Sequence, residues 1–196
     1  MTARIGIRRE DKSEWERRVP ITPQEASELQ QQGIQVLVQP SSIRAFSDQE
    51  FEQAGITLQE DLSSCPVVFG IKEMPEAFFQ AGKAYVFFAH VIKGQPYNMP
   101  MLRRMLDLGC TLIDYERVVD EQDRRLIFFG WHAGVAGMID TLWALGQRLA
   151  WEGIGNPFSE LRQTRTYCGA HSCAPYWNRR RARIETEGLP PEITPL

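Results

Sequence analysis

The 196-residue sequence predicts an α/β fold, in which helices flank a mostly parallel, Rossmann-like (flavodoxin-like) sheet. Short β-type runs recur along the first 130 residues, and most of them are continuously apolar. Strands have this character when helices cover both faces of a parallel sheet. Segments with clear helical start and stop signals lie between several of the runs, so the two observations indicate the same class.

The expected strands are short segments rich in valine, isoleucine, phenylalanine and tyrosine. They occupy residues 4–8, 34–39, 66–71, 84–90, 110–115 and 125–130.

Two of the expected helices begin with the same local device. Thr22 and Glu25 have the spacing of a capping box, in which each side chain accepts from a backbone N–H at the helix start. Ser47 and Glu50 repeat this spacing, and both segments end at a glycine. We therefore predict a helix after each of the first two strands.

Two further helices follow from apolar periodicity. The segment 98–109 places Met101, Leu102, Met105 and Leu106 on one face and ends at a glycine. A longer helix is expected from about residue 132 to 149, because apolar residues recur there at near-helical spacing.

These elements suggest three parts. Residues 1–131 form a first domain, residues 132–152 a bridging helix, and residues 153–196 an irregular tail with no sustained period. The last ten residues contain three prolines, a composition typical of a linker.

Composition narrows the function classes. A net charge of −3 and a pI near 5.7 give no overall electrostatic case for binding nucleic acid or an anionic membrane. The N-terminus lacks the apolar core of a signal peptide, and no run is long enough for a membrane helix. We expect a cytoplasmic protein with reduced thiols, or a mitochondrial one among eukaryotic relatives, although no transit peptide is visible.

Polar side chains follow three of the apolar runs. They are Lys72 and Glu73, His90 and Lys93, and Asp114 and Glu116. Ligands of open α/β sheets bind outside the carboxyl ends of the strands, so these side chains are candidates for a common site.

The residue types suit acid–base chemistry on an anionic substrate. A partly desolvated lysine and a histidine can both exchange protons near neutral pH. Arg18, before the first helix, and Arg125, at the start of the last expected strand, could each grip a carboxylate in a bidentate manner. On spacing alone, however, Lys72 is more often a solvated strand end, His90 a hydrogen-bonded rim residue, and each arginine a member of a surface ion pair.

Three other patterns carry less weight. The glycines of "GWHAGVAG" do not match the G-x-G-x-x-G dinucleotide fingerprint and are better explained by close helix packing. "CGAHSC" offers Cys168, His171 and Cys173, which are too few ligands for a zinc site, so we expect no metal. "NRRRAR" is more often a solvated face than a nucleic-acid patch.

Five motifs, in order, give the sequence a family resemblance. "ERRVPITP", "GIKEMPE", "FFAHVIKGQ", "LIDYERVVDEQDRRLIFFG" and "AGVAGM" resemble the N-terminal domain of the alanine dehydrogenase and pyridine nucleotide transhydrogenase superfamily. The similarity is greatest to its saccharopine-forming branch, the lysine–ketoglutarate reductases and lysine-forming saccharopine dehydrogenases. It covers residues 4 to about 158.

The resemblance implies a catalytic domain that works with a second, nucleotide-binding domain for NAD or NADP. The implied reaction joins lysine and 2-oxoglutarate through an imine, which is reduced to saccharopine. Lys72 and His90 would then be the acid–base pair, and Glu73 would tune the charge of Lys72. Arg18, Lys93, Arg125 and Phe129 would contact the substrate.

The resemblance also carries expectations about what surrounds this domain. A complete cofactor site is not encoded here, so we expect a truncated form that is inactive alone, with a separate nucleotide-binding subunit or a homo-oligomer as possible partners. Two alternatives stay open. One is an alanine dehydrogenase-like domain, and the other is a non-catalytic domain that binds an amino acid or keto acid.

Overall fold

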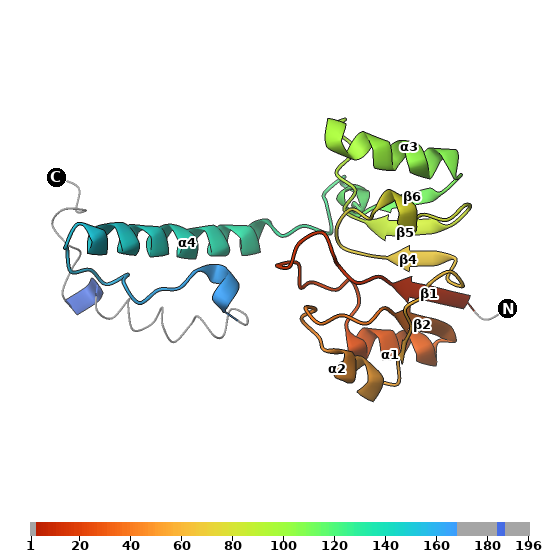
Figure 1. Ribbon diagram of the computed structural model, residues 1–196, viewed down its shortest axis with the longest axis horizontal. Helices are drawn as coiled ribbons and strands as arrows, with labels where there is room; N and C mark the ends of the chain where they lie inside the picture. Colours follow the sequence, from red (N-terminus) through yellow and green to blue (C-terminus); the bar gives the residue numbers. More distant parts are fainter. Residues whose placement is uncertain (1–2, 168–183, 187–196) are drawn as a thin grey trace. The chain divides into compact units, whose positions relative to one another are not determined.

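The computed structural model describes residues 3–167 and 184–186 of the chain (Figure 1). Its strands and α-helices, in chain order, are β1 (Ala3–Ile7), α1 (Pro23–Gln31), β2 (Ile34–Val38), α2 (Asp48–Gln53), β3 (Thr57–Leu58), β4 (Val67–Phe69), β5 (Ala84–Phe87), α3 (Met99–Asp107), β6 (Thr111–Asp114) and α4 (Gly130–Trp151). Short 3-10 turns η1 (Glu76–Phe78), η2 (Pro96–Asn98), η3 (Tyr115–Arg117) and η4 (Thr164–Thr166) lie in the connections.

The six strands form one sheet in the order β3-β2-β1-β4-β5-β6, and every pairing is parallel. This is the Rossmann order, so the predicted fold class is confirmed. The chain reverses its direction of travel across the sheet between β1 and β4. In open α/β sheets, the carboxyl ends of two such strands flank the usual ligand crevice.

Alternate residues of β2 show how the two faces of the sheet are covered. Val36 and Val38 pack with Ala26 of α1 and Phe51 of α2 in one core cluster. Leu37, between them, points to the opposite face, where its cluster includes the two buried methionines of α3. Helices α1 and α2 therefore cover one face, and α3 covers the other.

The predicted helix starts are confirmed in detail. Both capping boxes are present. The Thr22 and Ser47 side chains each accept from the backbone N–H three residues on, and the Glu25 and Glu50 side chains accept from the backbone N–H groups of Thr22 and Ser47. The apolar face assigned to α3 is partly wrong. Met101 and Met105 are buried, but Leu106 is 66% exposed because it lies past the edge of the buried stripe.

The expected strand over residues 125–130 is wrong. Arg125 makes only an isolated antiparallel bridge with Val119, and the segment is one arm of a short hairpin that turns at Asp123, whose φ is +59°. Ile127 packs against the core cluster of Ile71, Val86, Phe88 and Tyr115, but Leu126 and Phe128 are more than 60% exposed. Conversely, the two-residue strand β3 was not predicted, because two residues carry no periodic signal.

The chain divides into two compact units, Met1–Phe128 and Phe129–Leu196. The second unit begins with α4, which is slightly longer than expected. Close packing at Gly134 and Gly137 is not observed, since no described atom lies within 4 Å of a Cβ built at either position. It occurs instead at Gly146, where such a Cβ would lie 2.7 Å from the Phe158 carbonyl oxygen.

In the described residues, no helix is both long and apolar enough to cross a membrane. The "CGAHSC" and "NRRRAR" motifs and the proline-rich end lie outside the described residues.

Candidate active site

The carboxyl end of β4 is held in place by a residue of the β1–α1 connection. The Glu10 carboxylate accepts hydrogen bonds from the backbone N–H groups of Ile71, at 2.6 Å, and Lys72, at 3.0 Å. On its other side, the Ile71 carbonyl accepts from the N–H of Phe88 at 3.0 Å. The segment that presents Lys72 is thus fixed between the ends of the two adjacent strands, β1 and β5.

Glu73 is the centre of a polar network at the carboxyl ends of β1, β4 and β5, which we call the rim. Its Oε2 accepts from the Lys12 ammonium at 2.6 Å. Its Oε1 lies 2.8 Å from His90 Nδ1 and accepts from the side-chain amide of Asn98 at 3.1 Å. Burial alone would raise the pKa of Glu73, but the donors, with Lys12 the strongest, lower it to about 2. Glu73 is therefore ionised at neutral pH.

The ionised carboxylate determines the form of His90. An ionised carboxylate can only accept, so Nδ1 carries the proton in the 2.8 Å contact, and in the neutral ring Nε2 is left as the basic nitrogen. The backbone of His90 has φ = +50°, a left-handed conformation that costs a non-glycine residue about 1–2 kcal/mol. Such strain is typical of functional positions that their surroundings enforce.

Burial and charged neighbours shift the pKa values of two further glutamates at the rim in opposite directions. Glu10 is 7% exposed, and its pKa is raised chiefly by burial. Glu16 is also buried, but its pKa is lowered, because the Arg18 guanidinium outweighs the effect of burial. Lys72 contributes to this lowering, which places its ammonium within electrostatic reach of Glu16.

Arg18 contacts Glu16 through two nitrogens, Nε at 2.8 Å and Nη2 at 2.6 Å. This is the ion pair that the alternative interpretation predicts, and its bidentate partner is a carboxylate of the chain itself. A substrate carboxylate would have to share this guanidinium with Glu16 or displace it.

The remaining predicted residues make contacts of their own. Arg125 forms a 3.4 Å ion pair with Glu116. Lys93 is exposed. Phe129 opens the second unit, where its ring lies edge-on to His132. Asp114 uses Oδ1 to accept from the Glu116 N–H at 2.9 Å.

Sequence reasoning missed four members of the site: Glu10, Lys12, Glu16 and Asn98. Glu10 and Lys12 follow β1, so the strand-end rule that found Lys72 could have found them too. Asn98 had no comparable signal, because it precedes a helix and reaches the rim only through the fold.

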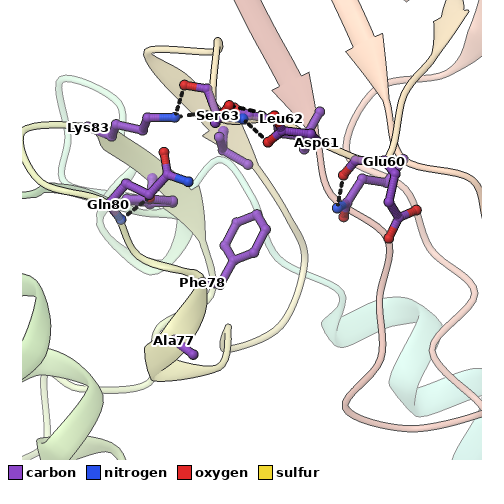
Figure 2. A pocket seen from close by; sticks show the side chains of 11 residues that line it. Glu60, Asp61, Leu62, Ser63, Ala77, Phe78, Gln80 and Lys83 are labelled. Atoms are coloured by element: carbon purple, nitrogen blue, oxygen red, sulfur yellow. Dashed lines mark hydrogen bonds between the residues drawn. The ribbon is translucent and has the colours of Figure 1, made fainter.

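A second region also contains a lysine, which lines a cavity. A cavity of about 260 Å³ lies over β4 and β5, lined by polar residues such as Asp61, Ser63, Gln80 and Lys83 (Figure 2). The Lys83 ammonium is already engaged, donating to the carbonyls of Ser63 at 2.6 Å and Leu62 at 3.2 Å. Burial lowers the pKa of Lys83. The cavity therefore holds a structural lysine.

Two observations bear on cofactors and metals. The β1–α1 connection, residues 8–22, lies where a Rossmann domain places its glycine-rich phosphate loop, but it contains no glycine. It therefore lacks the glycine-rich turn that cradles a pyrophosphate in those domains. Among the described residues, no group of three or more histidine, cysteine, aspartate or glutamate side chains is arranged to hold a metal ion.

Comparison with known proteins places the chain in a family. Residues 6–136 match the family model described as "Alanine dehydrogenase/PNT, N-terminal domain". The sequence is 42% identical over 163 residues to rat alpha-aminoadipic semialdehyde synthase, mitochondrial, a match covering 83% of this chain and 18% of the rat protein. It is 36% identical over 156 residues to saccharopine dehydrogenase [NAD(+), L-lysine-forming] of Yarrowia lipolytica, covering 75% of this chain and 42% of that protein.

Among solved structures, an L-alanine dehydrogenase superposes with a TM-score of 0.54 at 23% identity, covering 61% of this chain and 34% of that chain. A transhydrogenase from Sinorhizobium meliloti gives 0.51 at 17% identity, covering 60% and 36%. These likenesses support the fold. The chain spans about a fifth to two fifths of the length of the curated relatives cited here.

Proposed function

The chain belongs to the alanine dehydrogenase/PNT N-terminal domain family, and on that premise we propose that it is the catalytic portion of a saccharopine-forming or saccharopine-cleaving oxidoreductase. Its substrates would be lysine and 2-oxoglutarate. The observation that carries the proposal is the cluster at the β1/β4 switch point, where Glu73 is held ionised beside His90 and next to Lys72.

In the proposed reaction, the ε-amine of lysine attacks the ketone carbon of 2-oxoglutarate and forms a carbinolamine. Loss of water then gives an imine. Both steps need a group that takes a proton from nitrogen and a group that gives one to oxygen, first to the ketone oxygen as it becomes a hydroxyl and then to that hydroxyl as it leaves as water. His90 Nε2 is the basic nitrogen that can take the proton, and the Lys72 ammonium can give one.

The surrounding charges suit this chemistry. Glu73 holds the Nδ1 proton of His90, and so stabilises the imidazolium that forms when Nε2 accepts a proton. Arg18, Lys93 and Arg125 would bind the substrate carboxylates. NAD(P)H, when bound, would supply the hydride that reduces the imine.

The β1–α1 connection lacks the glycine-rich turn of a pyrophosphate site, and we propose that the hydride step uses a nucleotide-binding domain besides the described residues. We therefore expect no NAD(P)H oxidation from the 196-residue chain alone with lysine and 2-oxoglutarate. Robust turnover would contradict this part of the proposal.

The imine chemistry can be tested without a cofactor. Each cycle of imine formation and hydrolysis exchanges the ketone oxygen of 2-oxoglutarate with water. We expect the 196-residue chain to accelerate lysine-dependent uptake of ¹⁸O from labelled water, measured by mass spectrometry. Lys72→Met and His90→Gln should each reduce this acceleration by about 100-fold or more, the usual size of an acid–base contribution.

Calorimetry with saccharopine separates catalysis from binding. Arg125→Ala should weaken binding about 10-fold, the scale of one charged hydrogen bond. Its neighbour Arg124 pairs with Asp120 instead, so Arg124→Ala is the matched control and should bind normally. Saccharopine binding without any oxygen exchange would favour a non-catalytic binding domain.

A further inference from the structure

Asn98 is a buried residue that hydrogen-bonds both to Glu73 and to the turn that contains His90. It is the last residue of η2, directly before α3, and only 5% of its surface is exposed. Its side-chain amide nitrogen donates to three acceptors: Glu73 Oε1 at 3.1 Å, the Ala89 carbonyl at 3.0 Å and the His90 carbonyl at 3.2 Å. Two amide hydrogens are thus shared among three oxygens.

The three acceptors are the groups that set the geometry of His90. The two carbonyls belong to the turn that leaves β5, where His90 takes its left-handed conformation. The third acceptor is the same Glu73 oxygen that contacts His90 Nδ1 at 2.8 Å. One buried side chain therefore holds both the backbone of His90 and the partner of its ring.

The described contacts of Lys12 and Phe88 each restrain one part of this arrangement. Lys12 contacts Glu73 through the other oxygen, Oε2, and is 46% exposed. Phe88 stacks on the His90 ring with centroids 6.2 Å apart and planes inclined by 18°, which restrains the ring plane but cannot select which nitrogen bears the proton.

We propose that Asn98 is a positioning residue that keeps His90 in its left-handed turn with Nδ1 protonated against Glu73, so that Nε2 is the nitrogen available as a base. This assignment of a use for Nε2 rests on the proposed function. The positioning itself does not, because it concerns only contacts within the chain.

The test is ¹⁵N NMR of the 196-residue chain labelled at histidine, at alkaline pH where the imidazoles are neutral. The sequence has three histidines, and His90→Gln assigns the signal of interest. The wild-type chain should show His90 predominantly as the Nδ1–H tautomer. In Asn98→Ala, the Nε2–H tautomer should become the major form, because Glu73 and the His90 turn are no longer held together.

Asn156 provides the matched control. It is also 5% exposed, and its side-chain amide likewise bridges two carbonyls, those of Gly146 and Ile154. These bonds lie in the second unit and involve no residue of the rim. Asn156→Ala should therefore leave the His90 tautomer unchanged. An unchanged tautomer in Asn98→Ala, or an equal change in both variants, would overturn the proposal.

A second variant and a second measurement complete the test. If Asn98→Ala does not fold, Asn98→Ser retains a polar group too short to reach Glu73 and should give the same tautomer change. In the oxygen-exchange assay, the Asn98 variant should slow exchange at least 10-fold with saccharopine affinity within twofold of wild type. A tautomer change in a chain that neither binds saccharopine nor exchanges oxygen would refute the proposed function and leave the positioning role intact.

Discussion

Two lysines at opposite ends of the central strands show how context decides what a residue type can do. Lys72 follows the carboxyl end of β4, and Lys83 precedes the amino end of β5. Lys83 lines a cavity of about 260 Å³, and burial lowers the pKa of its ammonium, two features often taken to mark an active site (Figure 2).

The difference lies in their partners. Lys83 donates to two backbone carbonyls, neither of which can take part in proton exchange. Lys72 has its backbone N–H fixed by Glu10, and its ammonium lies in the field of Glu16, in a cluster that also contains His90. For this reason we propose the titratable groups at the topological switch point, and not the cavity around Lys83, as the functional site.

The largest expected effect comes from removing the charge at the centre of the rim. The pKa of Glu73 is about 2, against an ordinary value of 4.5. A lowered pKa stabilises the folded state above pH 4.5, and this stability is lost as the pH falls from there through 2. At 1.36 kcal/mol per unit, the contribution is about 3 kcal/mol.

Glu73→Gln should therefore lower the free energy of unfolding at pH 7 by about 3 kcal/mol and should flatten its loss between pH 4.5 and 2. Urea titrations followed by the amide signals of the sheet measure both quantities. An acid profile identical to that of the wild type would show that Glu73 is not the linked group.

Glu10 should behave in the opposite sense. Burial raises its pKa, so the folded state binds its proton more readily than the unfolded state does, and its charge costs stability at neutral pH. Glu10→Gln leaves one of the two backbone N–H groups at the end of β4 without its acceptor, which costs about 1–2 kcal/mol.

The wild-type chain should exceed Glu10→Gln in free energy of unfolding, and this difference should grow as the pH is lowered from 7 towards 4.5. The same urea titrations measure the difference at each pH. If the difference in the free energy of unfolding shrinks instead, Glu10 loses its proton more readily in the folded state than in the unfolded state. Its pKa would then shift in the same direction as that of Glu73.

The smallest effect is expected at the cavity. Lys83→Met removes two hydrogen bonds from a partly exposed ammonium, which should cost about 1 kcal/mol or less. Saccharopine affinity should stay within twofold of wild type by calorimetry. A large loss of affinity would move the candidate site from the β4 rim to the cavity.

Local signals made most of the fold predictable. Capping boxes and apolar runs act over a few residues, so α1, α2 and five of the strands could be read directly. The run at residues 125–130 misled because apolar content alone does not distinguish a strand from a hairpin arm, and a strand needs a neighbour to pair with.

The candidate site could be predicted only for residues whose place in the sequence, just after a strand, also determines their place in the fold. Lys72, Glu73 and His90 directly follow strands, so the position of each could be inferred. Asn98 acts through the packing of α3, and the ion pair of Arg18 with Glu16 depends on side-chain conformation within one loop. Contacts of this kind arise from tertiary structure and leave no periodic trace in the sequence.

The most direct test of the central claim is to map saccharopine binding by amide chemical shifts on the ¹⁵N-labelled 196-residue chain. We predict that the largest shifts occur at Glu10, Lys72 and His90, around the carboxyl ends of β1, β4 and β5. The largest shifts at Ser63, Gln80 and Lys83, with the rim unchanged, would contradict the claim that the switch point is the functional site.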